Sequence, residues 1–246
     1  MQRLIAIFIN KYVLLNFVDN MAKNPTLFQK AFVEGLGTFI LVFIGAGAII
    51  SSGYFFSGSA QLLVIALALG LALGMAVTIA LDISGGHINP AVTIAMLVTK
   101  RIKAYDAAVY IIAQLIGAVV GAGVLLIVPS SILSAGTFGL TSLNSSVSVF
   151  QGIAIEALIT FVLMIVVFAT TVDRRTIKMG GFAVGLALTL GILFAGPLTG
   201  GSANPARSFG PELITSNFTN WYVYWIGPII GAVIAALLYE YVLLRK

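Results

Sequence analysis

The sequence predicts an all-α membrane protein in which six membrane-spanning helices and two re-entrant half-helices form an inverted repeat. Composition is the first reason: 60% of the 246 residues are hydrophobic, only 9% are charged, and the mean hydropathy is +1.10. Soluble domains carry roughly 25% charged residues, so this chain cannot coat a soluble core. The other reasons are a series of long apolar runs and two copies of Asn-Pro-Ala, at 89–91 and 204–206.

The first 24 residues are expected to form an interfacial helix or a disordered extension. Residues 1–20 are mostly apolar, but charged and amide side chains interrupt them. The longest clean apolar run, residues 4–9, is far shorter than the roughly 20 residues that a span requires.

The first repeat is predicted over 25–128, with spans at about 30–50, 60–81 and 107–128 and a half-helix at about 86–98. An extracellular connecting loop rich in Ser, Thr and Gly is predicted over 129–149. The second repeat is predicted over 150–246, with spans at about 150–172, 180–196 and 221–243 and a half-helix at about 201–214. Gly196-Pro197 is taken to close the fifth span.

The two halves resemble each other beyond Asn-Pro-Ala, at offsets of 114 to 122 residues. Glu34 and Glu156 are equivalent, as are the Gly-Leu-Ala-Leu segments at 70–73 and 185–188. Each half has three spans, an odd number, so the second half must enter the membrane from the opposite side. Such inverted repeats place function near the membrane midplane, where the halves meet. Irregular backbone at that depth is tolerated only when it is buried in protein or lines a wet cavity, so the two loops predict a pore or a binding site.

Each Asn-Pro-Ala copy predicts a glycine turn followed by a helix start. Glycine permits a sharp turn, Asn is a good N-cap, and Pro suits the first helical position. Two helix N-termini would then face each other, each carrying roughly +0.5 of an elementary charge. A neutral molecule can accept hydrogen bonds there, whereas a cation is repelled. The candidate lining residues of these loops are Asn89, Pro90, Ala91, Asn204, Pro205, Ala206, Gly85, Gly86, Gly200 and His87.

The basic residues predict the orientation. With the N-terminus inside, every Lys and Arg except Arg207 falls on the cytoplasmic side, where positive charge collects. Both termini are therefore expected in the cytoplasm of a multi-pass cell-membrane protein. The net charge of +5 is explained by this flanking pattern and not by nucleic-acid binding.

The twin Asn-Pro-Ala copies, with Arg207 directly after the second, resemble the aquaporin and aquaglyceroporin family of major intrinsic proteins over about 25–245. The resemblance implies a six-helix bundle with two half-helices, assembled as a homotetramer with one pore per subunit. It implies single-file passage of water or small neutral solutes, with ions and protons excluded.

The resemblance also assigns an outer constriction, formed by Leu69, Ile192, Gly201 and Arg207. Water-selective members usually have an aromatic residue at the first position and His at the second, and glycerol facilitators usually have two aromatics. This chain has neither pattern, so we expect a wider, more apolar constriction that passes water and also glycerol-sized neutral solutes. Arg207 is expected to donate hydrogen bonds to the solute and to repel cations.

Glu34 and Glu156 lie inside spans, where a carboxylate is expensive and usually functional or paired. The favoured interpretation, from the resemblance, is that each accepts hydrogen bonds from the re-entrant loop of its own half. A proton relay is the alternative. His87 is expected to line the inner vestibule, since one histidine in the whole chain makes no metal site.

Two other functions remain open. A secondary transporter also uses inverted repeats and broken helices, but it would need a coupling site beyond the two glutamates. A structural junction protein would share the fold without meaningful flux. With no cysteine, one histidine and eight acidic residues, an enzyme is not expected, and neither is a cofactor.

Overall fold

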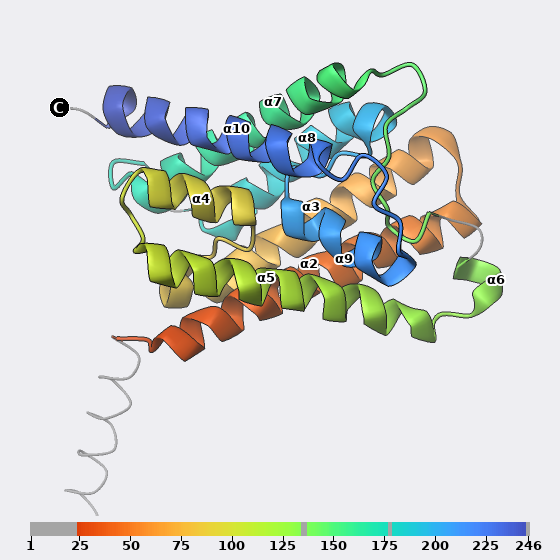
Figure 1. The fold of residues 1–246 in the computed structure, drawn as a ribbon, viewed down its shortest axis with the longest axis horizontal. Coiled ribbons are helices and arrows are strands. Elements are labelled where there is room, and N and C mark those ends of the chain that lie inside the picture. The colour runs from red at the N-terminus through yellow and green to blue at the C-terminus, as the bar shows by residue number, and fades with distance from the viewer. Residues whose placement is uncertain (1–23, 134–136, 177–178, 245–246) are drawn as a thin grey trace, which may run out of the picture.

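The computed structural model describes residues 24–133, 137–176 and 179–244 (Figure 1). The predicted N-terminal extension, apart from residue 24, lies outside the described residues. The described chain contains six helices long and apolar enough to cross a membrane: Leu27–Phe55, Gly58–Ser84, Ala104–Ile127, Val149–Val172, Gly181–Thr199 and Val223–Leu243. The predicted six spans are thereby confirmed.

The long helices are α2 (Leu27–Phe55), α3 (Gly58–Ser84), α5 (Ala104–Val124), α7 (Val149–Val167), α8 (Gly181–Thr199) and α10 (Val223–Leu238). A 3-10 turn, Leu125–Ile127, extends α5, and π-helical turns extend α7 (η2, Phe168–Val172) and α10 (η3, Tyr239–Leu243). A short helix that the sequence did not predict, α6 (Ser130–Leu133), begins the connecting segment.

The predicted end of the fifth span at Gly196-Pro197 is wrong. Helix α8 continues to Thr199 with Pro197 inside its last turn, where a missing N–H removes only one helical hydrogen bond. The helix ends instead at Gly200, whose φ of 81° is left-handed. Helix α3 ends in the same way at Gly85, with φ of 93°, so a glycine C-cap sets both ends.

The two half-helices, α4 (Pro90–Val98) and α9 (Pro205–Thr215), lie between the long helices with their N-termini toward each other (Figure 1). Their 9 and 11 residues are too few to cross a bilayer, which needs roughly 20. Helix α9 packs mainly on α5, and α4 packs mainly on α10. Each half-helix therefore packs mainly against a long helix of the other half.

Close helix contacts within and between the halves are made at glycines. A Cβ on Gly117 of α5 would overlap the backbone of Gly35 in α2, and a Cβ on Gly231 of α10 would overlap the carbonyl of Ala157 in α7. Helices α3 and α8 meet at the centre, where a Cβ on Gly185 would overlap the carbonyl oxygen of Gly70. Small residues let membrane helices approach in this way, because packing replaces the hydrophobic effect in lipid.

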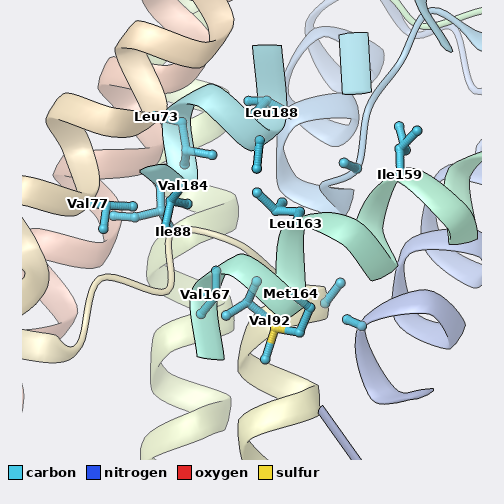
Figure 2. Packing of buried hydrophobic residues seen from close by; sticks show 14 of the residues in the cluster. Leu73, Val77, Ile88, Val92, Ile159, Leu163, Met164, Val167, Val184 and Leu188 are labelled. Atoms are coloured by element: carbon cyan, nitrogen blue, oxygen red, sulfur yellow. The ribbon is translucent and has the colours of Figure 1, made fainter. Parts of the chain in front are cut away.

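The main apolar core lies between the two halves (Figure 2). Ile88 and Val92, from the first loop and half-helix, pack in it with Leu163 and Met164 of α7 and with Val184 of α8. The two repeats therefore form one packed body around the half-helices.

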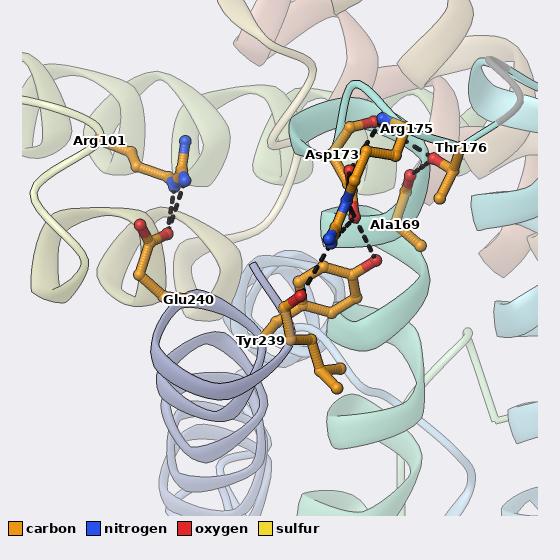
Figure 3. Close-up of polar contacts among 8 residues, drawn as sticks. Arg101, Ala169, Asp173, Arg175, Thr176, Tyr239 and Glu240 are labelled. Carbon is orange, nitrogen blue, oxygen red and sulfur yellow. Dashed lines mark hydrogen bonds and ion pairs between the residues drawn. The ribbon is translucent and has the colours of Figure 1, made fainter. Parts of the chain in front are cut away.

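The bundle has two opposite ends, an N-terminal face and a far face. The N-terminal face holds the start of α2, the loop 99–103, and residues 168–176, 179–180 and 239–244. The far face holds residues 55–58, 125–133, 137–148 and 215–222. On the N-terminal face, Arg101 pairs with Glu240 at 2.6 Å (Figure 3).

A second polar cluster on the N-terminal face joins η2 to η3 (Figure 3). Arg175 pairs with Asp173 at 2.7 Å and donates to the carbonyl oxygen of Leu243, and the Tyr239 hydroxyl donates to Asp173 at 3.2 Å. The hydrogen bonds from Arg175 hold the pKa of the Asp173 carboxyl well below its usual range. The carboxylate thus stays charged, and its contacts with Arg175 and Tyr239 hold the two π-helical turns together.

Candidate functional site

Two loops, 85–89 between α3 and α4 and 200–204 between α8 and α9, share one backbone path. Gly85 and Gly86 have φ of 93° and 61°, and Gly200 and Gly201 have φ of 81° and 58°. Two non-glycine residues at equivalent places, Ile88 and Ala203, are also left-handed, each with φ of 53°. Such residues cost roughly 1–3 kcal/mol each and persist only where the surroundings hold them.

In the first loop the holding group is Glu34 of α2, which is fully buried. Its carboxylate accepts hydrogen bonds from the backbone N–H of His87 at 2.9 Å and of Ile88 at 2.6 Å. It also accepts from the Ser84 hydroxyl at 2.6 Å and from the Gln114 amide at 2.7 Å. Every one of these donors is fixed to the loop or packed against it, so the carboxylate orders the loop backbone.

In the second loop Glu156 of α7 takes the equivalent place and is also fully buried. It accepts from the backbone N–H of Ser202 at 3.0 Å and of Ala203 at 2.8 Å, and from the Thr199 hydroxyl at 2.7 Å. A buried charge is tolerated only when it is fully hydrogen-bonded, and these two carboxylates meet that condition through their loops.

The sequence reasoning missed a pair of supporting tyrosines. The Tyr110 hydroxyl donates to the carbonyl oxygen of Ser84 at 3.0 Å, and the Tyr224 hydroxyl donates to that of Thr199 at 2.9 Å. They are 114 residues apart, an offset already present in the internal repeat. A search for polar residues at the repeat offset would have found them.

A further side-chain network at the first loop was also not predicted. The Gln114 amide nitrogen donates to Thr93 at 3.0 Å, and Thr93 contacts Nδ1 of His87 at 3.1 Å. The His87 ring lies edge-on to Tyr110, with centroids 5.3 Å apart. His87 is thereby held at the side of the loop that faces the N-terminal face.

The two Asn residues bring the loops together. Each caps its own half-helix, as predicted: the Asn89 side-chain oxygen accepts from Ala91 N–H at 2.9 Å, and that of Asn204 accepts from Ala206 N–H at 3.0 Å. Each amide nitrogen then donates across to the other loop. Asn89 donates to the carbonyl of Ala203 at 2.8 Å, and Asn204 donates to the carbonyl of Ile88 at 2.9 Å.

After this exchange, each Asn amide nitrogen still has one N–H that the opposite loop does not use. An amide nitrogen carries two N–H groups, and each Asn amide uses one of them on the opposite loop. Within the described residues the second N–H on each has no protein acceptor, so it can donate to a molecule between the half-helices. Because both helix N-termini meet there, the position combines hydrogen-bond donors with positive potential from two sides.

Arg207 follows the second Asn-Pro-Ala and is 3% exposed. Its Nη1 donates to the carbonyl oxygen of Gly139 in the connecting segment at 2.7 Å. Within the described part of the chain, its Nε and Nη2 have no hydrogen-bond partner. The guanidinium is therefore anchored at one nitrogen and presents two other donors.

The remaining predicted constriction residues are apolar and buried. Leu69 and Ile192 are each 1% exposed. Leu69 packs toward Gly45 of α2, and a Cβ on Gly201 would lie 2.9 Å from Cδ1 of Ile192. Ile192 thus fills part of the room that Gly201 leaves, which reduces the widening expected from that glycine.

Cavities approach the loops from both faces. On the far face, a cavity of about 270 Å³ reaches Ile192 and Gly200. On the N-terminal face, a cavity of about 780 Å³ reaches His87 and Gly85 and is bordered by Arg101. The Asn pair lies between the two openings. Within the described residues, no three His, Cys, Asp or Glu side chains gather as metal ligands.

Several known proteins are similar to this chain in sequence or in structure. The sequence profile of the family described as "Major intrinsic protein" matches residues 21–239. Aquaporin-4 of Mus musculus is 43% identical over 217 residues, covering 85% of this chain and 65% of its own length. The lens fiber major intrinsic protein of Lithobates pipiens is 43% identical over 224 residues, covering 90% and 83%.

The fold is also similar to a solved structure. The X-ray structure of the aquaglyceroporin from Plasmodium falciparum superimposes with a TM-score of 0.81 at 26% identity, covering 89% of this chain and 98% of that one. The profile match includes both Asn-Pro-Ala loops and all six long helices, from α2 to α10. On these grounds the chain belongs to the major intrinsic protein family.

Proposed function

We propose that the protein is a passive membrane channel for water and for small neutral solutes. The observation that carries the proposal is the meeting of the two half-helix N-termini, where Asn89 and Asn204 exchange hydrogen bonds and each keeps one N–H free. A water oxygen can accept from these donors and leave again, because each offers a single neutral hydrogen bond. The cavities on both faces supply the approaches.

Exclusion of ions and protons follows from charge and hydrogen-bond direction at the same place. Positive potential from two helix N-termini opposes cations, and Arg207 adds a permanent positive charge nearer the far face. Two donors on one water oxygen orient that water so that it donates to neighbours on both sides, which interrupts a proton-conducting chain. Selectivity by pore width, lining donors and positive barriers is how aquaporin-type pores are described in general.

Glycerol-sized solutes are proposed as second permeants because the constriction has apolar walls. Leu69 and Ile192 present aliphatic carbon, and Arg207 presents two donor nitrogens. A polyol can place its carbon backbone on the first two and its hydroxyls on the third. The likeness in fold to an aquaglyceroporin is consistent with such a path.

We further propose that the N-terminal face is cytoplasmic and that four copies assemble, each with its own pore. Described basic residues gather on the N-terminal face, among them Lys100, Arg101, Lys103, Arg174 and Arg175. Cytoplasmic loops collect such residues. Tagging the termini in intact cells tests the orientation, and native mass spectrometry tests the tetramer.

Stopped-flow light scattering on proteoliposomes tests the channel itself. A sucrose shock should shrink the vesicles faster than protein-free vesicles, and a glycerol shock should give fast shrinkage followed by fast re-swelling. Shrinkage without re-swelling would remove glycerol from the proposal. No fast phase with folded protein would contradict the channel and favour a structural or transporter role.

A further inference from the structure

Glu212 is a buried acidic residue that has no role in the pore as proposed above. It lies in α9 and is 2% exposed. Neither of its carboxylate oxygens receives a hydrogen bond from any protein group in the described part of the chain. Buried polar atoms are nearly always hydrogen-bonded, to protein or to ordered water, so a carboxylate in this position needs an explanation.

The surroundings of Glu212 place it beside the constriction. Ser208, one helical turn earlier on the same face of α9, contacts Thr141 of the connecting segment at 3.0 Å. Pro211, the residue before Glu212, lies against Gly139, whose carbonyl oxygen holds Arg207. Glu212 and Arg207 lie five residues apart in α9, a rise of about 7.5 Å along the helix axis, so two long side chains can approach each other there.

The repeat shows that these two charges occur together in one half only. At the offset of 115 residues that relates the two Asn-Pro-Ala copies, Arg207 is equivalent to Val92 and Glu212 to Leu97. The first half-helix has neither charge, and the second has both. Among the charged residues on the far-face side of the Asn pair, Glu156 is already engaged by its loop, which leaves Glu212 as the free counter-charge.

The unsatisfied atoms on the two residues are complementary. Arg207 has Nε and Nη2 without protein partners, and Glu212 has both oxygens without protein partners. We propose that Glu212 is the counter-charge of Arg207, that bridging water joins the two groups, and that Glu212 thereby sets how far the constriction admits small anions. The inference rests on the proposed channel function and names a specificity-determining residue within it.

The physical consequence follows from the net charge near the constriction. With Glu212 ionised, the Arg207 charge is compensated, so an anion gains little by entering, while the guanidinium still donates hydrogen bonds. Without the carboxylate, the constriction carries an uncompensated positive charge in a medium of low dielectric, where attraction for an anion is strong. A bridging water suits two such groups, because it can accept from the guanidinium and donate to the carboxylate.

The first experiment compares Glu212→Gln with the wild type in proteoliposomes, measuring water permeability and chloride efflux on the same vesicles. Chloride efflux should rise about tenfold, as expected when one charge is removed near a partly buried path, and water permeability should change by less than about twofold. Glu212→Met, with a chain of like length and no charge, should raise efflux equally. Asp106→Asn, the same charge change at the start of α5 on the N-terminal face, is the matched control and should change neither flux.

The second experiment separates a charge effect from a structural one. In an Arg207→Val background Glu212 is the uncompensated charge, so sodium efflux should appear, and adding Glu212→Gln should lower it about tenfold. If Glu212→Gln raises chloride efflux in the wild-type background and lowers sodium efflux in the Arg207→Val background, the charges of Glu212 and Arg207 act as a pair. Unchanged chloride efflux in both Glu212 variants with normal water flux, or loss of water flux in both, would overturn the role of Glu212. Absence of water flux in the wild type would instead contradict the channel.

Discussion

The two re-entrant loops have the same backbone and different side-chain surroundings. Both use two left-handed glycines, one left-handed non-glycine residue, a glutamate that binds two backbone N–H groups, and a tyrosine that binds the end of the preceding helix. Around the first loop the polar side chains are amide, imidazole and hydroxyl groups, apart from Glu34 itself. Around the second lie Arg207 and Glu212.

The difference indicates which features serve folding and which serve selectivity. Features that both loops share hold irregular backbone inside a membrane, where every N–H and C=O needs a partner. Features that only the second loop has, Arg207 and Glu212, lie toward the far face, where the constriction is proposed. We therefore expect changes to shared features to cost stability, and changes to unshared features to alter which solutes pass.

Replacing the two loop glutamates should cause the largest losses of stability, and the two losses should be unequal. Glu156→Gln puts an NH₂ group against fixed backbone N–H donors, which should lower the free energy of unfolding by about 3 kcal/mol or more. Glu34→Gln should cost roughly half as much. The side-chain amide of the neighbouring Gln114 can rotate so that its Oε1 accepts a hydrogen bond from the NH₂ group introduced at position 34. In the described chain this Oε1 has no other partner.

Chemical denaturation in detergent micelles measures both losses. Adding Gln114→Leu to Glu34→Gln removes the compensating amide and should bring the loss to the level of Glu156→Gln. Equal losses in the two single variants would show that Gln114 does not adapt. Folded Glu→Gln proteins with wild-type stability would contradict the supporting role proposed for both carboxylates.

The C-cap glycines give a second unequal pair. A Cβ on Gly85 would meet only the His87 ring, at 3.6 Å, so Gly85→Ala should cost about 1 kcal/mol, the price of a left-handed alanine. A Cβ on Gly200 would lie 3.1 Å from the backbone of Thr141 and Ser142 in the connecting segment. Gly200→Ala should therefore cost about 2 kcal/mol, because strain and overpacking add. Melting temperatures of the two variants in the same detergent test the order, and a greater loss for Gly85→Ala would show that the connecting segment moves aside freely.

A change of solute selectivity is expected only at the second loop. Leu69→Phe combined with Ile192→His replaces two aliphatic walls by a ring and a polar donor and should lower the ratio of glycerol to water permeability about tenfold. His87→Ala, on the side of the first loop, is the matched comparison and should leave the ratio unchanged. Stopped-flow measurements with sucrose and glycerol give both permeabilities. A similar fall in the ratio for His87→Ala would place a selective constriction on the N-terminal side as well.

Much of the shared plan could be predicted from sequence because its signals are local. Apolar run length gives the spans, and Gly, Asn and Pro give the loop and the helix start within a few residues. The repeat offset relates the two halves, and it would have found Tyr110 and Tyr224 had it been applied to every polar position. The fifth span was misjudged at Pro197, since a proline in a last helical turn costs one hydrogen bond and does not stop the helix.

The unshared surroundings of the second loop could not be predicted, because they depend on contacts between distant segments. Arg207 meets the carbonyl of Gly139 across 68 residues of sequence, and any residue type can supply a carbonyl. The packing of Ile192 into the space beside Gly201 depends on the exact path of the loop. Glu212 carried a signal that was not used: it is the only acidic residue in either half-helix.

The smallest effect is expected at the N-terminal face, where the halves also differ. Among the described helices, only α7 and α10 of the second half continue into π-helical turns, and the Asp173–Arg175 pair joins these turns. Because its pKa is depressed in the folded protein, Asp173 contributes stability that is present above the unfolded-state pKa of about 3.9 and is lost as the pH falls toward the folded value. Asp173→Asn should therefore lower the melting temperature by a similar small amount from about pH 5 to pH 8, and the gap to the wild type should close in strong acid. If the difference in melting temperature instead widened as the pH fell, the Asp173 carboxyl would be protonated in the folded protein. The Asp173–Arg175 ion pair would then not hold the two turns together.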